Sequence, residues 1–142
     1  MPMRVTSFSC EPVRMLALAT AVAAASATVS AHHSIAGYYD SSRRVTIDAA
    51  IARVAFVSPH PYMDVDVRRG TSAERWRLEM DNRWEFEDIG ITAESFKAGD
   101  QVVVTGSLAR REPNQMYVER LRRPADGFGF EQVNSRPRRL GR

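Results

Sequence analysis

Five runs of residues between Val45 and Leu121 place hydrophobic side chains at every second position, and this period of two constrains the fold more than any other feature. Successive side chains of a β-strand point to opposite faces, so the pattern predicts strands that each bury one face. The predicted strands cover residues 45–57, 62–68, 75–80, 101–109 and 115–121. The first is so long that we expect it to bend or bulge partway.

One helical segment is predicted between the third and fourth strands. Asp81 or Asn82 has the residue type of an N-cap, and Gly90 is typical of a helix end. The short helix between them places Trp84 and Phe86 at positions that we expect to pack in the core. Thr92 is expected to cap a second short turn. Five strands with this one helical insertion predict an all-β fold, a small OB-like barrel, with an open sandwich of the same strands as the alternative.

The first 31 residues have the features of a secretion signal. Arg4 and Arg14 supply positive charge, residues 15–25 form an apolar and small-residue run, and Ala31 ends a small-residue cleavage sequence. We therefore expect a signal helix over residues 1–31 and export to the periplasm. Cys10 would leave with the signal, so the exported chain would have neither a disulfide nor a thiolate metal site.

The exported chain, residues 32–142, divides into three predicted parts. Residues 32–44 read as an extended lead-in, residues 45–130 as the barrel domain, and residues 131–142 as a disordered, Arg-rich tail. The full chain has a net charge of +3 with both signs interspersed, which does not indicate nucleic-acid binding. No second apolar stretch follows the signal, so the exported protein is not expected to span a membrane.

All three histidines of the chain are candidate metal ligands. Cleavage after Ala31 would give His32 a free α-amine, and the amine with its own ring would form a chelate. His60 stands between two prolines, whose rigidity would hold an imidazole in place. Planar nitrogen sites suit Cu(II), so the sequence suggests a copper site made by His32 and His60, with His33 as an alternative ligand.

Two simpler interpretations remain open for these histidines. His32 and His33 could be part of an unstructured terminus, while His60 caps a loop. Cleavage after Ala27 would leave four residues ahead of His32 and remove the terminal chelate.

A metal-independent binding module of the cell envelope is the alternative function. Tyr38, Tyr39 and Tyr62 could form an aromatic platform for a carbohydrate, or a surface for an envelope partner, with neighbouring arginines as contacts. Neither Ser34 nor Ser58 has the setting of a catalytic triad, and no Gly-rich phosphate loop is present. We therefore do not expect an enzyme.

Several motifs of the chain resemble a family of small exported bacterial proteins, the domain of unknown function 6152. They are His32-His33-Ser34, Ser58-Pro59-His60-Pro61-Tyr62, Trp76-x-Leu78-Glu79 and Phe96-Lys97-Ala98-Gly99-Asp100. The resemblance implies an OB-type barrel in the periplasm and favours cleavage after Ala31, but it supplies no activity. The chain departs from the family pattern at Ser58, where Asn is common, and at Gly90-Ile91, where Gly-Trp is usual.

Overall fold

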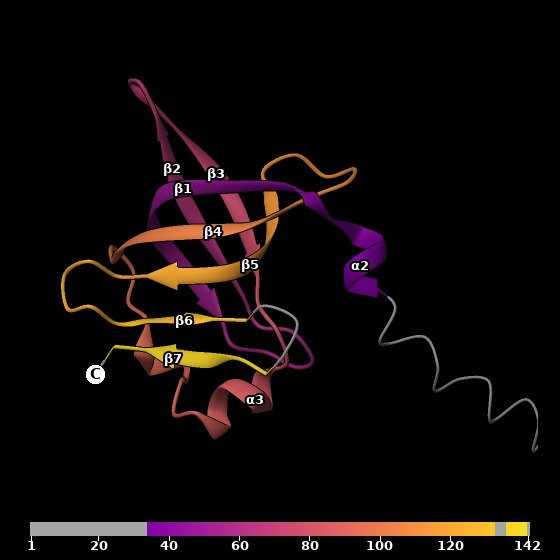
Figure 1. Ribbon diagram of the computed structural model, residues 1–142. Coiled ribbons are helices and arrows are strands. Elements are labelled where there is room, and N and C mark those ends of the chain that lie inside the picture. The colour runs from indigo at the N-terminus through magenta and orange to yellow at the C-terminus, as the bar shows by residue number, and fades with distance from the viewer. Residues whose placement is uncertain (1–33, 133–135, 142) are drawn as a thin grey trace, which may run out of the picture. The chain divides into compact units, whose positions relative to one another are not determined.

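The computed structural model of the protein describes residues 34–132 and 136–141 (Figure 1). The described residues from Ile35 onward form one compact unit. The predicted signal peptide, His32 and His33 lie outside the described residues. The elements, in chain order, are α2 (Ser34–Tyr38), β1 (Tyr39–Ala55), β2 (Tyr62–Arg69), β3 (Ser72–Glu79), α3 (Arg83–Asp88), the 3-10 helix η2 (Ala93–Ser95), β4 (Gln101–Ala109), β5 (Gln115–Arg122), β6 (Gly129–Glu131) and β7 (Arg138–Leu140). The prediction of an all-β fold is confirmed.

All seven strands belong to one sheet with the order β3-β2-β1-β4-β5-β6-β7. The long β1 pairs with β4 along Tyr39–Ala50 and with β2 along Ala49–Ala55, and its register shifts in both ladders, as its length predicts. The hairpin of β2 and β3 crosses behind β1 and β4 in Figure 1. All of these ladders are antiparallel.

The series of strands is joined back on itself by a parallel pairing of β3 with β5. Residues 77–79 of β3 pair with residues 115–117 of β5. Further along the same edge of β5, Arg120–Arg122 pair instead with β6. The sheet therefore has two strands more than the five predicted, because β6 and β7 extend it beyond β5.

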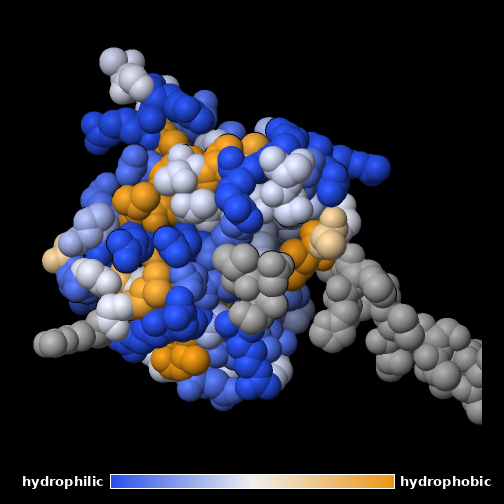
Figure 2. Space-filling view, viewed as in Figure 1, coloured by the Kyte–Doolittle hydropathy of each residue, from blue (hydrophilic) through white to orange (hydrophobic). Residues whose placement is uncertain are grey.

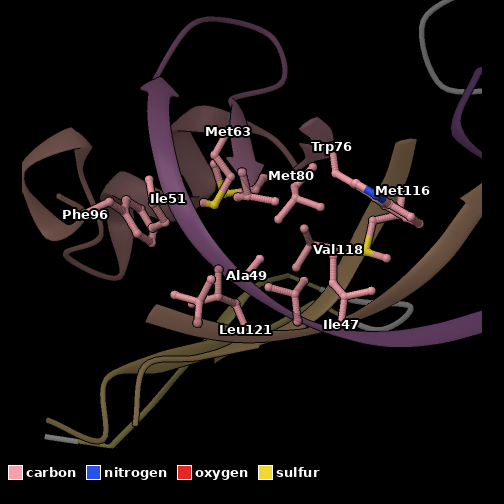
Figure 3. Packing of buried hydrophobic residues seen from close by; sticks show 14 of the residues in the cluster. Ile47, Ala49, Ile51, Met63, Trp76, Met80, Phe96, Met116, Val118 and Leu121 are labelled. Carbon is pink, nitrogen blue, oxygen red and sulfur yellow. The ribbon is translucent and has the colours of Figure 1, made fainter. Parts of the chain in front are cut away.

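The core lies inside this curved sheet. Figure 3 shows side chains from β1, β2, β3 and β5 pointing into one interior, among them Ile51, Met63 and Val118. From α3 and the segment after it, Phe86 and Ile91 add two completely buried side chains. Phe86 packs edge-on against Phe130 of β6, with ring centroids 4.9 Å apart. The apolar positions of the period-two pattern thus form the core, while the face shown in Figure 2 is largely hydrophilic with separate hydrophobic areas.

The helical segment begins and ends where the sequence predicts, but one of its residues faces the other way. Asn82 caps α3 by accepting a hydrogen bond from the Trp84 amide. Trp84 itself is 50% exposed, which contradicts its expected place in the core. Residues two apart on an α-helix lie about 200° apart, so Trp84 and Phe86 cannot both face the core.

Both ends of the domain are more structured than predicted. In the expected extended lead-in, residues 34–38 are helical, and β1 begins at Tyr39 because Tyr39 and Asp40 pair with the end of β4. In the expected disordered tail, β7 pairs with β6. Glu131 of β6 forms ion pairs with both Arg120 and Arg138, so part of the arginine charge that suggested a solvated tail is paired on the surface of the sheet. None of the described helices has the length and hydrophobicity needed to cross a membrane.

Gln132 completes the sheet where β5 changes partner from β3 to β6. Its Nε2 donates to the Val118 carbonyl at 2.5 Å, and its Oε1 accepts from the Asp81 amide at 3.1 Å. The Gln132 amide donates to the Glu119 carbonyl at 2.8 Å. Gln132 is 2% exposed, so its side chain replaces backbone pairing at a place that water does not reach.

We expect Gln132→Ala to lower the free energy of unfolding by about 2–4 kcal/mol, because it leaves the Val118 carbonyl and the Asp81 amide without partners. Gln101→Ala is the matched control, since Gln101 lies exposed at the start of β4 and should change stability by less than about 0.5 kcal/mol. Urea unfolding of the two variants and the wild type measures both. Equal stabilities of the two variants would contradict the role given to Gln132.

Candidate functional site

The loop that carries His60 is fixed on both sides of the histidine, to the first residue of α3 and to the segment before it. The Pro59 carbonyl accepts a hydrogen bond from the Arg83 amide at 3.0 Å. The Pro61 carbonyl accepts from the Met80 amide at 2.8 Å. The loop is thus held by backbone contacts in addition to its prolines, of which Pro59 follows a cis peptide bond.

His60 itself has an unusual environment. Among the buried side-chain nitrogen and oxygen atoms of the described residues, Nδ1 of His60 alone has no hydrogen-bond partner. The ring as a whole is only partly buried. A buried polar atom without a partner costs about 1–3 kcal/mol, so its persistence in a fixed loop points to a partner that the described residues do not supply.

The other members of the predicted metal site cannot be placed beside His60, because His32 and His33 lie outside the described residues. Within residues 34–132 and 136–141, no three His, Cys, Asp or Glu side chains are grouped as a metal site would require. A copper site would therefore depend on donors from residues 32 and 33.

The three tyrosines of the suggested platform do not share one exposed surface. Tyr38 is 42% exposed, whereas Tyr39 is buried and packs against Tyr38 and Tyr117. The ring of Tyr62 has the guanidinium of Arg77 over it at 4.4 Å and that of Arg53 at 5.6 Å. Stacking of a sugar on Tyr62 would have to displace an arginine.

Asp64 explains why these two arginines stay over Tyr62. It accepts from Arg53 at 3.0 Å and from Arg77 at 3.2 Å. Partial burial acts to raise the pKa of Asp64, but the hydrogen bonds from both arginines outweigh it and lower the pKa. The side chains thus form one ion-pair network on the outer face of β1, β2 and β3.

A second site lies on the other side of β1, where polar side chains surround a half-open hollow of about 480 Å³. The structure buries three polar or charged residues among those it describes, and all three line this hollow. We call it the polar hollow and define it by Tyr39, Arg44, Ser107, Tyr117, Glu119 and Gln132. Ile35 and Ala36 of α2 form part of its wall. Its volume is within the range of small-ligand pockets.

Two irregularities in strand pairing create the polar hollow. In the ladder of β1 and β4, Asp40 pairs with Leu108 and Arg44 with the next residue, Ser107, so residues 41–43 bulge outward. In the ladder of β4 and β5, Glu119 is an extra residue on β5, located between the partners of Gly106 and Thr105. Bulges redirect side chains and are frequent beside binding sites.

The carboxylate of Glu119 is the buried charge of the polar hollow. Ser107 Oγ donates to its Oε1 at 2.6 Å, and Arg44 Nε lies 2.6 Å from its Oε2. The Glu119 side chain is 11% exposed, but that of Arg44 is 53% exposed. The charge of Glu119 is thus neutralised by a guanidinium that reaches in from the surface.

Further carboxylates influence the two tyrosines of the polar hollow. Tyr39 donates its phenol proton to Glu79 Oε2 at 2.5 Å and accepts from Gln115 Nε2 at 2.9 Å. Burial, together with the hydrogen bond to Glu79, raises the pKa of Tyr39 far above its ordinary 10.0. Burial and then the negative charge of Asp81 raise the pKa of Tyr117 in the same way. Both phenols therefore stay protonated, and Tyr39 donates its proton to Glu79.

Sequence reasoning missed this site, apart from naming Tyr39. Strict alternation in β5 puts Met116, Val118 and Arg120 on one face, and Glu119 and Leu121 on the other. In the structure Leu121 is buried and Arg120 is exposed. The improbable placement of an arginine on the core face was the signal that a bulge interrupts the strand near Glu119.

Comparison with protein-family models supports the suggested relationship. Residues 19–116 match the model described as a family of unknown function, DUF6152. The chain belongs to this family. The match includes the His60 loop and the whole of β4, while Glu119 and Gln132 lie beyond its end. No curated protein matches the chain. Membership of DUF6152 therefore identifies relatives but assigns no activity.

We expect the Tyr39→Phe variant to lose less stability than the wild type when the pH rises from neutral to alkaline. The raised pKa of folded Tyr39 means that above about pH 10 the unfolded state releases the phenol proton while the folded state keeps it. The contribution of Tyr39 to the free energy of unfolding is therefore complete below about pH 10 and is lost as the pH rises further. Urea unfolding at neutral pH and at about pH 11 should show a smaller difference for the variant than for the wild type. The same difference in both proteins would mean that Tyr39 does not titrate in this way.

Proposed function

We propose that this member of DUF6152 is an exported binding module of the periplasm, built on an OB-type five-stranded barrel. The support for export is the sequence of residues 1–31. The support for the barrel is the pairing of β1 with β2 and β4, together with the parallel pairing of β3 with β5, which links the five long strands in a ring. A helical segment between β3 and β4 agrees with the same architecture.

The ligand that we propose is Cu(II), held by the α-amine and ring of His32 together with His60. The observation that carries this proposal is the buried Nδ1 of His60, which has no partner among the described residues. An imidazole nitrogen in a fixed loop is a suitable ligand for copper. The amine and ring of His32 would complete a planar nitrogen set, with His33 as the alternative donor. The proposed role is binding, without catalytic turnover.

The metal-independent alternative draws its support from the polar hollow rather than from Tyr62. The Tyr62 ring is covered by Arg77 and Arg53, whereas the polar hollow is open on one side and has a buried carboxylate. An envelope partner or a small ligand could be bound there without copper.

We expect His60→Ala to weaken copper binding by at least about 100-fold while the thermal midpoint of the copper-free protein stays close to that of the wild type. The variant removes a nitrogen donor but also the unpaired buried atom, so no stabilising hydrogen bond of Nδ1 is lost. Competition titration against a chromogenic copper chelator measures the affinity. His33→Ala is the matched control and should change the affinity only if His33 replaces His32. Unchanged affinity in His60→Ala would exclude His60 as a ligand.

We also expect the periplasmic form to begin at His32 and to retain one copper ion in native mass spectrometry. A single alanine placed before His32 should abolish tight binding, because it separates the α-amine from the His32 ring and leaves all three imidazoles in place. A mass that begins at Thr28, or tight binding by the extended variant, would rule out the terminal chelate. The same spectrum reports the mature terminus and the stoichiometry.

A further inference from the structure

We infer that the polar hollow is a binding site for a small organic ammonium ion, and that Arg44 occupies the place of this ion in the free protein. The inference rests on the proposal that the domain is a binding module, but it does not depend on copper. It begins from the buried carboxylate of Glu119, whose two oxygens receive one hydroxyl donor and one guanidinium.

The balance of charge at the polar hollow favours a cation. Glu119 lies at its surface, and Glu79 and Asp81 lie behind the two tyrosine hydroxyl groups. Arg44 is the cation among the residues that line the hollow. This gathering of carboxylates is a local feature, since the protein as a whole has a net charge of +3.

The walls of the polar hollow suit an organic cation better than a metal ion. The buried ring of Tyr39 and the half-buried ring of Tyr117 lie with their centroids 5.7 Å apart and inclined by 42°. Aromatic rings attract ammonium groups, and a carboxylate beside them supplies the counter-charge. The described residues place no group of three metal-binding side chains here. Tyr39 also donates its phenol proton to Glu79, which makes its ring more electron-rich.

Arg44 is easily displaced from Glu119. Its side chain is half exposed and extends from the bulge of residues 41–43, where Asp40 Oδ1 accepts hydrogen bonds from the amide and hydroxyl of Ser42. The Arg44 guanidinium is hydrated when it leaves Glu119, and a bound ammonium ion would keep the carboxylate paired, so the ligand competes with a partly solvent-screened ion pair. The two protein partners of Glu119 thus differ in mobility: Arg44 can move into solvent, whereas Ser107 is buried and stays in place.

Two substitutions, one that removes a positive charge and one that removes a negative charge, distinguish an ammonium site from its alternatives. Choline and putrescine are the probes, and their binding to the full exported protein is measured by isothermal titration calorimetry. Arg44→Ala removes the competitor and should tighten binding roughly two- to fivefold. Glu119→Gln should weaken binding by at least about tenfold, because it removes the charge but retains an oxygen acceptor for Ser107.

Arg43→Ala is the matched control for Arg44→Ala. Arg43 is an exposed arginine of the same bulge, so its removal changes the net charge equally without freeing Glu119. We expect it to change the affinity for choline much less than Arg44→Ala does. Equal effects of the two substitutions would overturn the assignment of Arg44 as the competitor.

Other outcomes would overturn the inference as a whole. Benzoate that binds the wild type and is lost in Arg44→Ala would make the polar hollow an anion site. Glucose binding of equal affinity in the wild type and in Glu119→Gln would make it a sugar site. No heat of binding with choline or putrescine at tens of millimolar would rule out an ammonium site. If Glu119→Gln does not fold, the direction of the Arg44→Ala effect decides by itself. Copper affinity measured on the same variants should be unchanged, so failure here is distinguishable from failure of the copper proposal.

Discussion

The structure depends on how β5 divides one of its edges between two other strands. Residues 115–117 pair with β3, residues 120–122 pair with β6, and the side chain of Gln132 satisfies the backbone groups between them. Buried backbone groups must be paired, and a domain without disulfides cannot leave long strand edges open. The parallel pairing covers the end of β3 and the start of β5, and it helps to enclose the core side chains in Figure 3.

The same place in the sheet produces the polar hollow. A regular ladder would send Glu119 into solvent or into the core, but the bulge in β5 directs it against Ser107, and the bulge in β1 brings Arg44 to it. Irregular pairing leaves room between strands, and polar side chains fill part of it. The site therefore results from the way the sheet is completed, and it does not come from a loop added to a finished fold.

The two proposed sites differ in the chemistry that they offer. The His60 loop is held by backbone hydrogen bonds on both sides of the histidine and presents an imidazole nitrogen, which suits a metal ion that accepts nitrogen ligands. The polar hollow presents a carboxylate and two aromatic rings, which suit an organic cation. Because the donor sets share no residue, the two binding events can be tested and lost independently.

Local pattern in the sequence was enough to predict the five long strands, an N-cap of α3 at Asp81 or Asn82, and the bounds of β4 to the residue, because alternation and capping depend on near neighbours. It also identified the family and the rigid loop around His60. The exposure of Trp84, the strand β7 and the inward turn of Glu119 were decided only by the tertiary structure. Each of these depends on which distant strand supplies the partner for a backbone group or a charge, and that pairing has no signature within a short window of residues.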